Sequence, residues 1–420
     1  MKLLIKQARV VDPLSPFNGQ ITDIYIENDS ISSIGNNKIF EPDKEIHLPN
    51  MHISPGWVDS FADFSDPGYE YRENLESGAA AAAAGGYTDV MVIPNTKPPI
   101  HNKAAVEYIM QKSRSLPVNV HPIGAVTTNL EGKELAEMYD MRASGAIAFS
   151  DGTKCIQSTG LLVKALQYVK AFNGIIIQIP DDKSIQANGL MNEGVVSTQL
   201  GLPGKPAVAE ELIVARDIKL TRYAQSRLHF TSVSTRKSIE YVQRGKQGGT
   251  DVSCSVTPYH LFFSDEDLQS YDTNLKVNPP LRTREERDAL RFAVENGWID
   301  CIASHHHPFE FDSKVLEFEY AKSGMISLET AYAVLQTAIP SLNPQRTVEL
   351  LAINPRKIFG LPAATIAEGS TASITLFDPM KKWMVRQADI LSRSKNSPFI
   401  NKELTGKPLG IIHKGNLILN

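Results

Sequence analysis

Eight short apolar runs, separated by helix-length amphipathic stretches, limit the folds open to this 420-residue chain more than any other feature. The runs cover residues 53–64, 87–94, 118–126, 145–151, 174–180, 228–234, 252–260 and 299–307. Four intervening stretches, rich in Ala, Leu, Glu and Arg as helices are, cover residues 75–85, 160–172, 210–224 and 284–297. Continuously apolar strands are typical of parallel sheets buried on both faces. The pattern therefore predicts a (β/α)8 TIM barrel, with an open doubly wound sheet as the alternative.

Both ends of the chain show the two-residue alternation of half-buried strands. In the first 50 residues the alternating apolar positions are Ile24, Ile26, Ile31 and Ile34. A matching pattern at the other end covers residues 373–377 and 411–419, across the turn Gly415-Asn416. We therefore expect residues 1–50 and 365–420 to share one small β-sandwich domain, and residues 51–364 to form the barrel.

Charge and composition exclude several classes of partner. The 43 Lys and Arg against 47 Asp and Glu give a net charge of −4, which argues against nucleic acid or an anionic membrane as the main partner. No run of about 18 apolar residues occurs, and the first six residues are too charged for a signal sequence. Three widely spaced cysteines, Cys155, Cys254 and Cys301, predict reduced, buried thiols and a cytoplasmic location.

Side chains that could carry chemistry stand where the predicted strands end, which is where reactive groups lie in such a barrel. They are Phe61, Asp63, Asn95, Asp151, Gln178, Ser232, His260 and the cluster His305-His306-His307. Residues 305 and 307 share one face of a strand and could ligate a metal together with the inward-facing Asp63 and Asp151. Contiguous histidines without spaced histidine or cysteine partners favour a structural role instead. Phe61 is expected to serve packing, and would be an apolar plug if it fills a vacated metal cavity.

Motifs of a characteristic kind occur along most of the chain. Among them are Pro55-Gly56-Trp57-Val58-Asp59, Pro94-Asn95-Thr96, Met191-Asn192-Glu193-Gly194, Leu202-Pro203-Gly204, Ala209-Glu210-Glu211 and Val277-Asn278-Pro279-Pro280. Others cover residues 66–73, 81–86, 148–151, 227–229, 233–235, 256–261 and 396–399. Together they resemble the dihydroorotases of the amidohydrolase superfamily.

That resemblance implies a barrel with a metal centre and a role in pyrimidine biosynthesis, where dihydroorotate and carbamoyl aspartate interconvert. In the family a His-x-His pair after strand one, a carboxylate or modified lysine after strand four, and histidines after strands five and six hold one or two zinc ions. An aspartate after strand eight shuttles the proton. The metal lowers the pKa of a bound water so that hydroxide exists near neutral pH.

This chain departs from the family's ligand set at almost every position. In place of the His-x-His pair, the two later histidines and the aspartate, it has Phe61-Ala62-Asp63, Gln178, Ser232 and His305. Only Asp151 matches, and it could be a lone ligand or an acceptor of turn hydrogen bonds. Ser65 stands where the family has the arginine that holds the substrate carboxylate.

The size of the metal's effect shows what these replacements imply. Losing zinc would raise the cost of forming hydroxide by roughly 12 kcal/mol at most, since the pKa of water is about 15.7 free and about 7 on zinc. A general base typically contributes about 10² to 10⁴ in rate, which does not compensate. The resemblance therefore implies that the usual mechanism is absent and that no cofactor is needed, with zinc expected only in a rearranged site of Asp63, Asp151 and His305.

Part of the family's substrate frame is matched. Asn95 and Asn278 match positions that hydrogen-bond the substrate, and His306 matches the histidine near it; the two asparagines could equally be turn residues kept for the fold. We therefore expect a non-catalytic homologue that serves as an assembly or scaffold subunit beside aspartate transcarbamoylase or an active dihydroorotase. The alternatives are an active cyclic amidohydrolase with a rearranged metal site and a sensor of a small-molecule ligand. A homodimer is expected by analogy alone.

Overall fold

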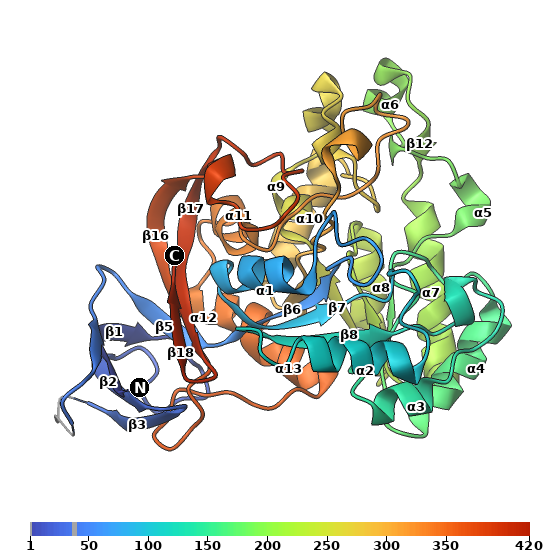
Figure 1. Ribbon diagram of the computed structural model, residues 1–420. Helices are drawn as coiled ribbons and strands as arrows, with labels where there is room; N and C mark the ends of the chain where they lie inside the picture. Colours follow the sequence, from blue (N-terminus) through green and yellow to red (C-terminus); the bar gives the residue numbers. More distant parts are fainter. Residues whose placement is uncertain (1, 36–39) are drawn as a thin grey trace.

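The computed structural model describes residues 2–35 and 40–420, and its centre is a closed parallel barrel (Figure 1). In pairing order the strands are β6 (Trp57–Ala62), β7 (Tyr87–Val92), β8 (Asn119–Gly124), β9 (Ala148–Phe149), β10 (Ile176–Gln178), β13 (Leu228–Phe230), β14 (Val252–Val256) and β15 (Cys301–Ile302). A parallel bridge between Ala62 and His306 joins the first strand to the last. The predicted eight-stranded barrel is confirmed, and the open sheet is excluded because it would leave these two strands unpaired.

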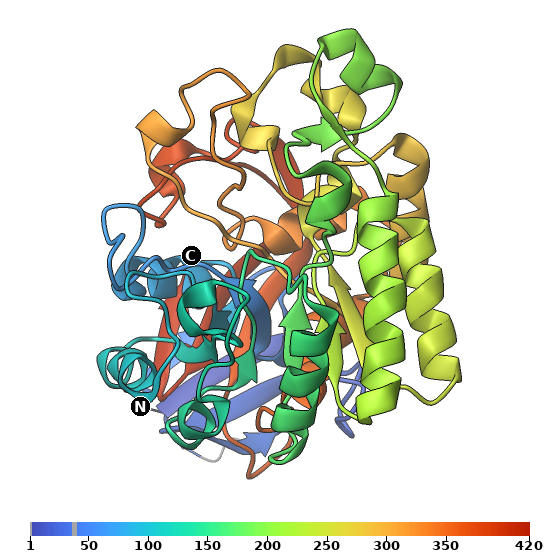
Figure 2. The same cartoon turned by 90° about the vertical axis from the view of Figure 1, so that its right-hand side faces the viewer.

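Helices surround the barrel on its outer side (Figure 2). They are α1 (Leu75–Ala84), α2 (Lys103–Lys112), α3 (Met138–Ala143), α4 (Thr159–Lys170), α7 (Val208–Ala224), α8 (Arg236–Gln247), α10 (Arg284–Glu295), α11 (Ala331–Ala338), α12 (Pro344–Val348) and α13 (Asn354–Phe359). Side-chain caps explain where several begin: Asn74, Ser158 and Thr283 accept backbone N–H groups of the first turns of α1, α4 and α10. Within the described residues, no helix has the length and apolar character needed to cross a membrane.

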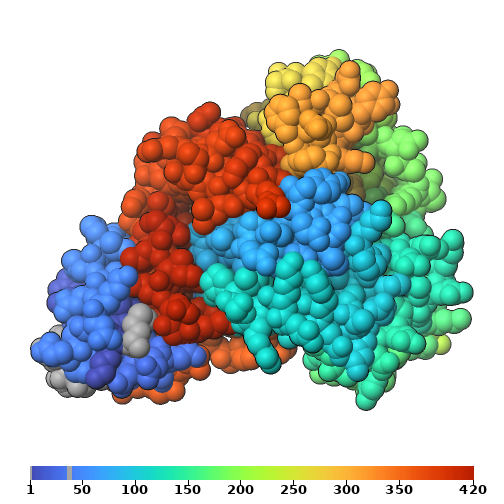
Figure 3. Space-filling model, viewed as in Figure 1, coloured from blue at the N-terminus to red at the C-terminus, as the bar shows by residue number. Residues whose placement is uncertain are grey.

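Longer loops with small elements follow several strands at the mouth of the barrel. These elements are α5 (Lys183–Gln186), β11 (Met191–Asn192), α6 (Val195–Leu200), β12 (Gly204–Lys205) and α9 (Pro258–Phe262), with 3-10 turns over Thr128–Leu130, Asp265–Ser270, Thr273–Leu275, Phe311–Ser313 and Gln387–Asp389. The loops coloured yellow and orange, at and after residue 260, project above the rest of the molecule (Figure 3). Such loops carry function in barrels, because the strands hold them rigidly from below.

The barrel interior is an apolar core of its own. Its side chains come from the strands and from α13 at the closed end, and they are Phe61, Met91, Ile93, Ile123, Ala148, Ile175, Ile177, Ile179, Ala303 and Phe359. A larger cluster fills the space between strands and helices. The barrel is therefore packed, and a ligand can enter only at its mouth.

The two ends of the chain meet in one sheet beside the barrel, as predicted. Its strands are β1 (Lys2–Val10), β2 (Ile21–Glu27), β3 (Ser30–Ile34), β4 (Lys44–Ile46), β5 (His52–Pro55), β16 (Ile374–Met384), β17 (Glu403–His413) and β18 (Asn416–Leu419). β5 connects the halves because it pairs with both β1 and β16. The limits 1–50, 51–364 and 365–420 stay a prediction.

Candidate functional site

A cavity of about 820 Å³ opens at the carboxyl ends of the barrel strands. Of the residues expected from the sequence, Asp63, Asn95, Asn278 and the neighbouring His307 line it. Seven others do not belong to its lining as far as the described residues show: Phe61, Asp151, Gln178, Ser232, His260, His305 and His306. The expected site is therefore divided between a cavity wall and a buried layer beneath or beside it.

Phe61 and His305 close the interior below the cavity. Both side chains are fully buried, and their rings stack with centroids 4.5 Å apart and planes 22° from parallel. His305 Nε2 lies 2.7 Å from Thr231 Oγ1. Burial, with the nearby histidines as a smaller cause, holds the pKa of His305 well below its usual range, so the ring is neutral at pH 7.

A chain of hydrogen bonds continues from His305 into the barrel. Thr231 Oγ1 lies 2.9 Å from Ser255 Oγ, which lies 3.0 Å from His229 Nε2, and His229 Nδ1 lies 2.8 Å from Ser253 Oγ. Burial lowers the pKa of His229 to about 3. This chain of hydrogen bonds consists of neutral imidazoles and hydroxyls. Each of these buried polar groups therefore has a hydrogen-bond partner, as buried polar groups usually do.

Asp151 and Gln178 are engaged by their own surroundings. Asp151 Oδ1 accepts the backbone N–H groups of Val126 (3.1 Å) and Thr127 (2.9 Å), and its other oxygen accepts from Thr127 Oγ1 at 2.5 Å. Burial nevertheless raises the pKa of this carboxyl. Gln178 accepts the N–H of Ile156 at 3.2 Å and donates to Asp217 at 3.0 Å. Asp151 therefore holds the β8 loop through contacts with residues 24 and 25 positions away, and its role as a lone ligand or as an acceptor within its own turn stays a prediction.

Three residues that follow barrel strands have an unusual backbone conformation although none of them is glycine. Ser65, Ser232 and His305 have φ angles of 56°, 58° and 49°, in the left-handed region that few non-glycine residues adopt. All three are buried. Because such conformations cluster at functional sites, these three positions support the strand ends as the place of the candidate site.

These residues do not fit the zinc centre that the fold implies. Zinc takes three or four nitrogen, sulfur or oxygen ligands around one point. Residues 2–35 and 40–420 contain no group of three or more His, Cys, Asp or Glu side chains that could hold a metal ion. Asp63, Asp151 and His305, the candidate set for a rearranged site, are therefore not brought together as ligands.

The cavity wall carries more charge than the sequence led us to expect. Asp63 accepts the N–H of Ser65 at 2.6 Å, and its other oxygen lies 3.8 Å from His307 Nδ1. Asn278 Oδ1 accepts from Lys205 Nζ at 2.8 Å, and the same ammonium pairs with Asp181 at 2.8 Å. Lys205 and Asp181 lie far from Asn278 in sequence, so no local pattern connects the three.

Other cations also line the cavity. Arg72 pairs with Glu310 at 2.9 Å, and its guanidinium lies over the ring of Tyr69, 4.7 Å from the centroid. Lys183, Lys276 and Lys322 complete the basic part of the lining. Asn95, on the facing wall, exchanges hydrogen bonds of 3.2 and 3.3 Å with Thr153. The cavity is thus polar, with five Lys or Arg side chains against Asp63, Asp181 and Glu319, and suits a small anion better than an apolar ligand.

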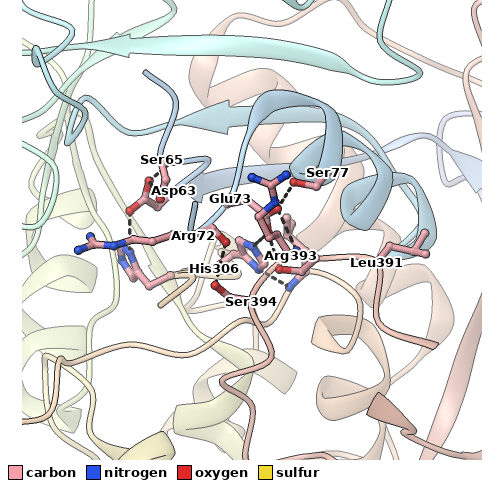
Figure 4. A network of polar contacts seen from close by, with 12 residues as sticks. Asp63, Ser65, Arg72, Glu73, Ser77, His306, Leu391, Arg393 and Ser394 are labelled. Atoms are coloured by element: carbon pink, nitrogen blue, oxygen red, sulfur yellow. Dashed lines mark hydrogen bonds and ion pairs between the residues drawn. The ribbon is translucent and has the colours of Figure 1, made fainter. Parts of the chain in front are cut away.

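His306 points away from the cavity, into a buried network around Glu73 (Figure 4). Its Nδ1 accepts the N–H of Ser327 at 3.2 Å, so Nε2 carries the proton and faces Glu73 at 3.4 Å. Glu73 also accepts from Ser77 and Ser392. Burial raises the pKa of Glu73, but these hydrogen bonds outweigh it and leave the pKa below its usual value. In this conformation His306 connects elements, and its contact with a ligand stays a prediction.

Comparison with known proteins adds three findings. The family model described as Dihydro-orotase-like matches residues 51–238. A dihydroorotase of Syntrophus aciditrophicus is 38% identical over 423 residues, covering 100% of this chain and 99% of the relative, and one of Caldicellulosiruptor saccharolyticus is 39% identical over 422 residues, covering 99% and 98%. Among solved structures, the L-hydantoinase (dihydropyrimidinase) of Arthrobacter aurescens has a TM-score of 0.87 at 24% identity, covering 100% of this chain and 96% of its own. The last likeness concerns the fold.

Proposed function

The chain belongs to the dihydroorotase family, and we propose that it is a member without hydrolase activity that serves pyrimidine biosynthesis as an assembly or scaffold subunit. The observation that carries this proposal is the plug formed by Phe61 and His305 at the positions where the family holds its metal. Gln178 and Ser232 add no charge there, and Asp151 is engaged by Val126 and Thr127. The barrel is intact, but Phe61, Gln178 and Ser232 at its strand ends are uncharged. This combination supports a role that depends on the shape of the protein.

The test is a dihydroorotase assay in both directions with the purified protein supplied with zinc or manganese, together with metal analysis. We expect no turnover above the uncatalysed rate and less than one metal ion per ten chains. Ring closure of carbamoyl aspartate at a rate typical of enzymes, about 1 s⁻¹ or more, would overturn the proposal.

A second candidate is dihydroorotase activity itself, which the names and 38–39% identity of the full-length relatives favour. It requires a metal held by Asp63, Asp151 and His305 after rearrangement of the mouth. Stoichiometric zinc and a loss of activity in His305→Ala would support it. A protein without bound metal that is inactive in the assay above would exclude it.

A small-molecule ligand is a third proposal, and it is compatible with either of the others. The wall residues Asn95, Asn278 and Lys205 support binding of a carboxylate, with His306 as a further candidate contact. Dihydroorotate, carbamoyl aspartate or orotate should then raise the melting temperature, because a ligand that binds only the folded state stabilises it. A flat melting series up to millimolar ligand would contradict binding.

The partner we propose is aspartate transcarbamoylase or an active dihydroorotase, within the cytoplasm, and a homodimer is the proposed state of the chain itself. Three free, buried cysteines suit a reducing compartment. Neither nucleic acid nor a membrane is proposed as a partner, since the net charge is −4.

A further inference from the structure

Five large apolar side chains stand in solvent on the loops above the barrel mouth. They are Tyr271, Phe311, Val315, Leu316 and Tyr320, which we call the mouth patch, and their exposed fractions lie between 44% and 75%. The loops that carry them are part of the orange and yellow prominence in Figure 3. Large apolar residues that gather on one surface mark an interaction site, whereas scattered ones do not.

The loop under the patch is held rigidly from inside. Lys314 Nζ donates to the carbonyls of Lys322 (2.7 Å) and Gly324 (3.0 Å), and Lys276 Nζ donates to those of Phe318 (2.6 Å) and Glu319 (2.8 Å). Both lysines and the Phe318 ring are buried. Buried lysines are rare, because an ammonium group loses its water shell on burial. This loop nevertheless accepts hydrogen bonds from two buried lysines on its backbone carbonyls. It therefore presents its exposed side chains in one conformation.

A shallow, open hollow lies beside Tyr271, Val315 and Leu316 of the patch. The hollow measures about 600 Å³ and lies between the two loops, with walls from Tyr271, Asp272, Thr273, Lys314, Val315, Leu316 and Glu317. Thr273 Oγ1 donates a hydrogen bond to Lys314 O at 2.6 Å, and this hydrogen bond joins the two loops beside the hollow. The apolar side chains Tyr271, Val315 and Leu316 beside this shallow hollow offer a partner a place for an apolar anchor.

Acidic side chains predominate around the patch. Asp312, Glu317 and Glu319 alternate with the apolar residues and are exposed. None of the three forms an ion pair within 4.0 Å with another residue in the described parts of the chain. Of the lysines in the same segment, Lys314 is buried on carbonyl groups, whereas Lys322 is exposed near Glu319. Three exposed carboxylates against one exposed lysine leave this segment with a net negative charge, and its complement is a surface with Lys or Arg around an apolar anchor.

We propose that the mouth patch is the docking surface for a protein partner that presents an apolar side chain surrounded by basic residues. A second copy of this chain is disfavoured, because a two-fold contact through this patch would bring two acidic surfaces together. An anionic membrane is disfavoured for the same electrostatic reason. This inference rests on the proposed function, since a scaffold subunit requires a surface for its partner.

The experiment titrates the full chain with purified aspartate transcarbamoylase of the same organism and, separately, with its active dihydroorotase, by sedimentation velocity at 50 and 300 mM salt. The apolar variant is Phe311→Ser with Leu316→Ser, and the charge variant is Glu317→Lys with Glu319→Lys. The matched control is Leu212→Ser with Tyr223→Ser, two exposed side chains of α7. Unchanged melting temperatures establish that each variant is folded.

We expect one of the probes to bind the natural chain and the control equally. The apolar and charge variants should each raise Kd at least tenfold, and the affinity of the natural chain should fall at 300 mM salt. Full affinity in the apolar variant would overturn the surface and leave the proposed function standing. Binding of neither probe would overturn both. Loss of self-association in the apolar variant, or binding of the natural chain to phosphatidylglycerol vesicles, would assign the patch to a second copy or to a membrane instead.

Discussion

Among single residues, Phe61 has the largest consequence for what the barrel interior can do. An aromatic ring at this position fills space that a polar ligand side chain and its metal would need, and it packs with Met91, Ile93 and Ala303 in the interior core. Because protein interiors are close-packed, the ring stabilises the barrel while it excludes water. Phe61 therefore supplies packing at this position and no ligand atom.

Replacing Phe61 by Ala should lower the free energy of unfolding by about 3–5 kcal/mol, because the cavity left behind adds to the lost burial. Urea unfolding followed by fluorescence would measure the loss. Phe292→Ala is the matched control, since that ring is 53% exposed and its loss should cost no more than about 1 kcal/mol. Equal losses in the two variants would show that Phe61 is not packed as described.

The buried side chain of Lys314 should make the free energy of unfolding depend on pH. Burial lowers its pKa from 10.5 to about 7, although Asp272 nearby acts in the opposite direction. Between pH 7 and 10.5 the unfolded chain binds a proton that the folded chain does not, so stability rises with pH in this window, by at most about 1.4 kcal/mol per unit from this group. Below pH 7 both states are protonated and the contribution is constant.

The measurement is urea unfolding of the natural chain and of Lys314→Met from pH 6.5 to 9.5. We expect the natural chain to gain stability with pH relative to the variant. Lys237→Met is the control, because that side chain is on the surface. Parallel curves for all three proteins would contradict a lowered pKa at Lys314.

Among elements, the segment 391–394 between β16 and β17 connects the terminal sheet to the barrel. Glu329 accepts the N–H groups of Leu391 (2.6 Å) and Ser392 (3.2 Å), and Glu73 accepts that of Arg393 (3.1 Å) as well as the hydroxyl of Ser392. The two carboxylates precede α11 and α1. Ordering of this segment therefore depends on charged acceptors contributed by the barrel.

Replacing Glu73 by Gln should destabilise this connection by about 1.5–3 kcal/mol, the range for hydrogen bonds to a charged group. We expect faster amide hydrogen exchange at residues 391–394 and unchanged exchange in β8. Since hydrogen bonds lower the pKa of Glu73, its contribution is present above pH 4.5 and is lost as pH falls through the folded pKa. Glu76→Gln, an exposed neighbour, is the control, and faster exchange in both variants would contradict the role given to Glu73.

On the scale of the whole molecule, aromatic packing and buried hydrogen bonds join the terminal sheet to the barrel. Trp57, Tyr87, Tyr332 and Phe377 form one aromatic cluster between the two parts. The Arg356 guanidinium joins Asp89 at 2.6 Å and the carbonyl of Gly56 at 2.9 Å beside this cluster. Packing and hydrogen bonds of the chain itself thus supply the contacts that hold these parts together.

The melting temperature should therefore be the same in EDTA and in excess zinc. A resident ion that binds only the folded state would raise it in proportion to the logarithm of its concentration. Differential scanning calorimetry across micromolar to millimolar zinc is the measurement, with a metal-dependent barrel enzyme as the positive control. A rise of several degrees with zinc would contradict the plugged interior.

The strands, helices and barrel could be predicted from local patterns. Eight apolar runs became the eight barrel strands, and the stretches at 75–85, 160–172, 210–224 and 284–297 became α1, α4, α7 and α10, with capping side chains at the starts of α1, α4 and α10. Burial periodicity and capping act over a few residues, so they can be recognised along the chain. The absence of the family's ligand types was visible in the same way, residue by residue.

Which side chains meet could not be recognised along the chain. Lys205 reaches Asn278 and Asp181, His306 turns from the cavity toward Glu73, and Asp151 turns to the β8 loop. These contacts join residues between 24 and 233 positions apart, and they follow from how loops pack above a closed barrel. A sequence pattern indicates which local conformation a segment prefers. A site depends on long-range packing between segments, and only the folded chain provides that packing.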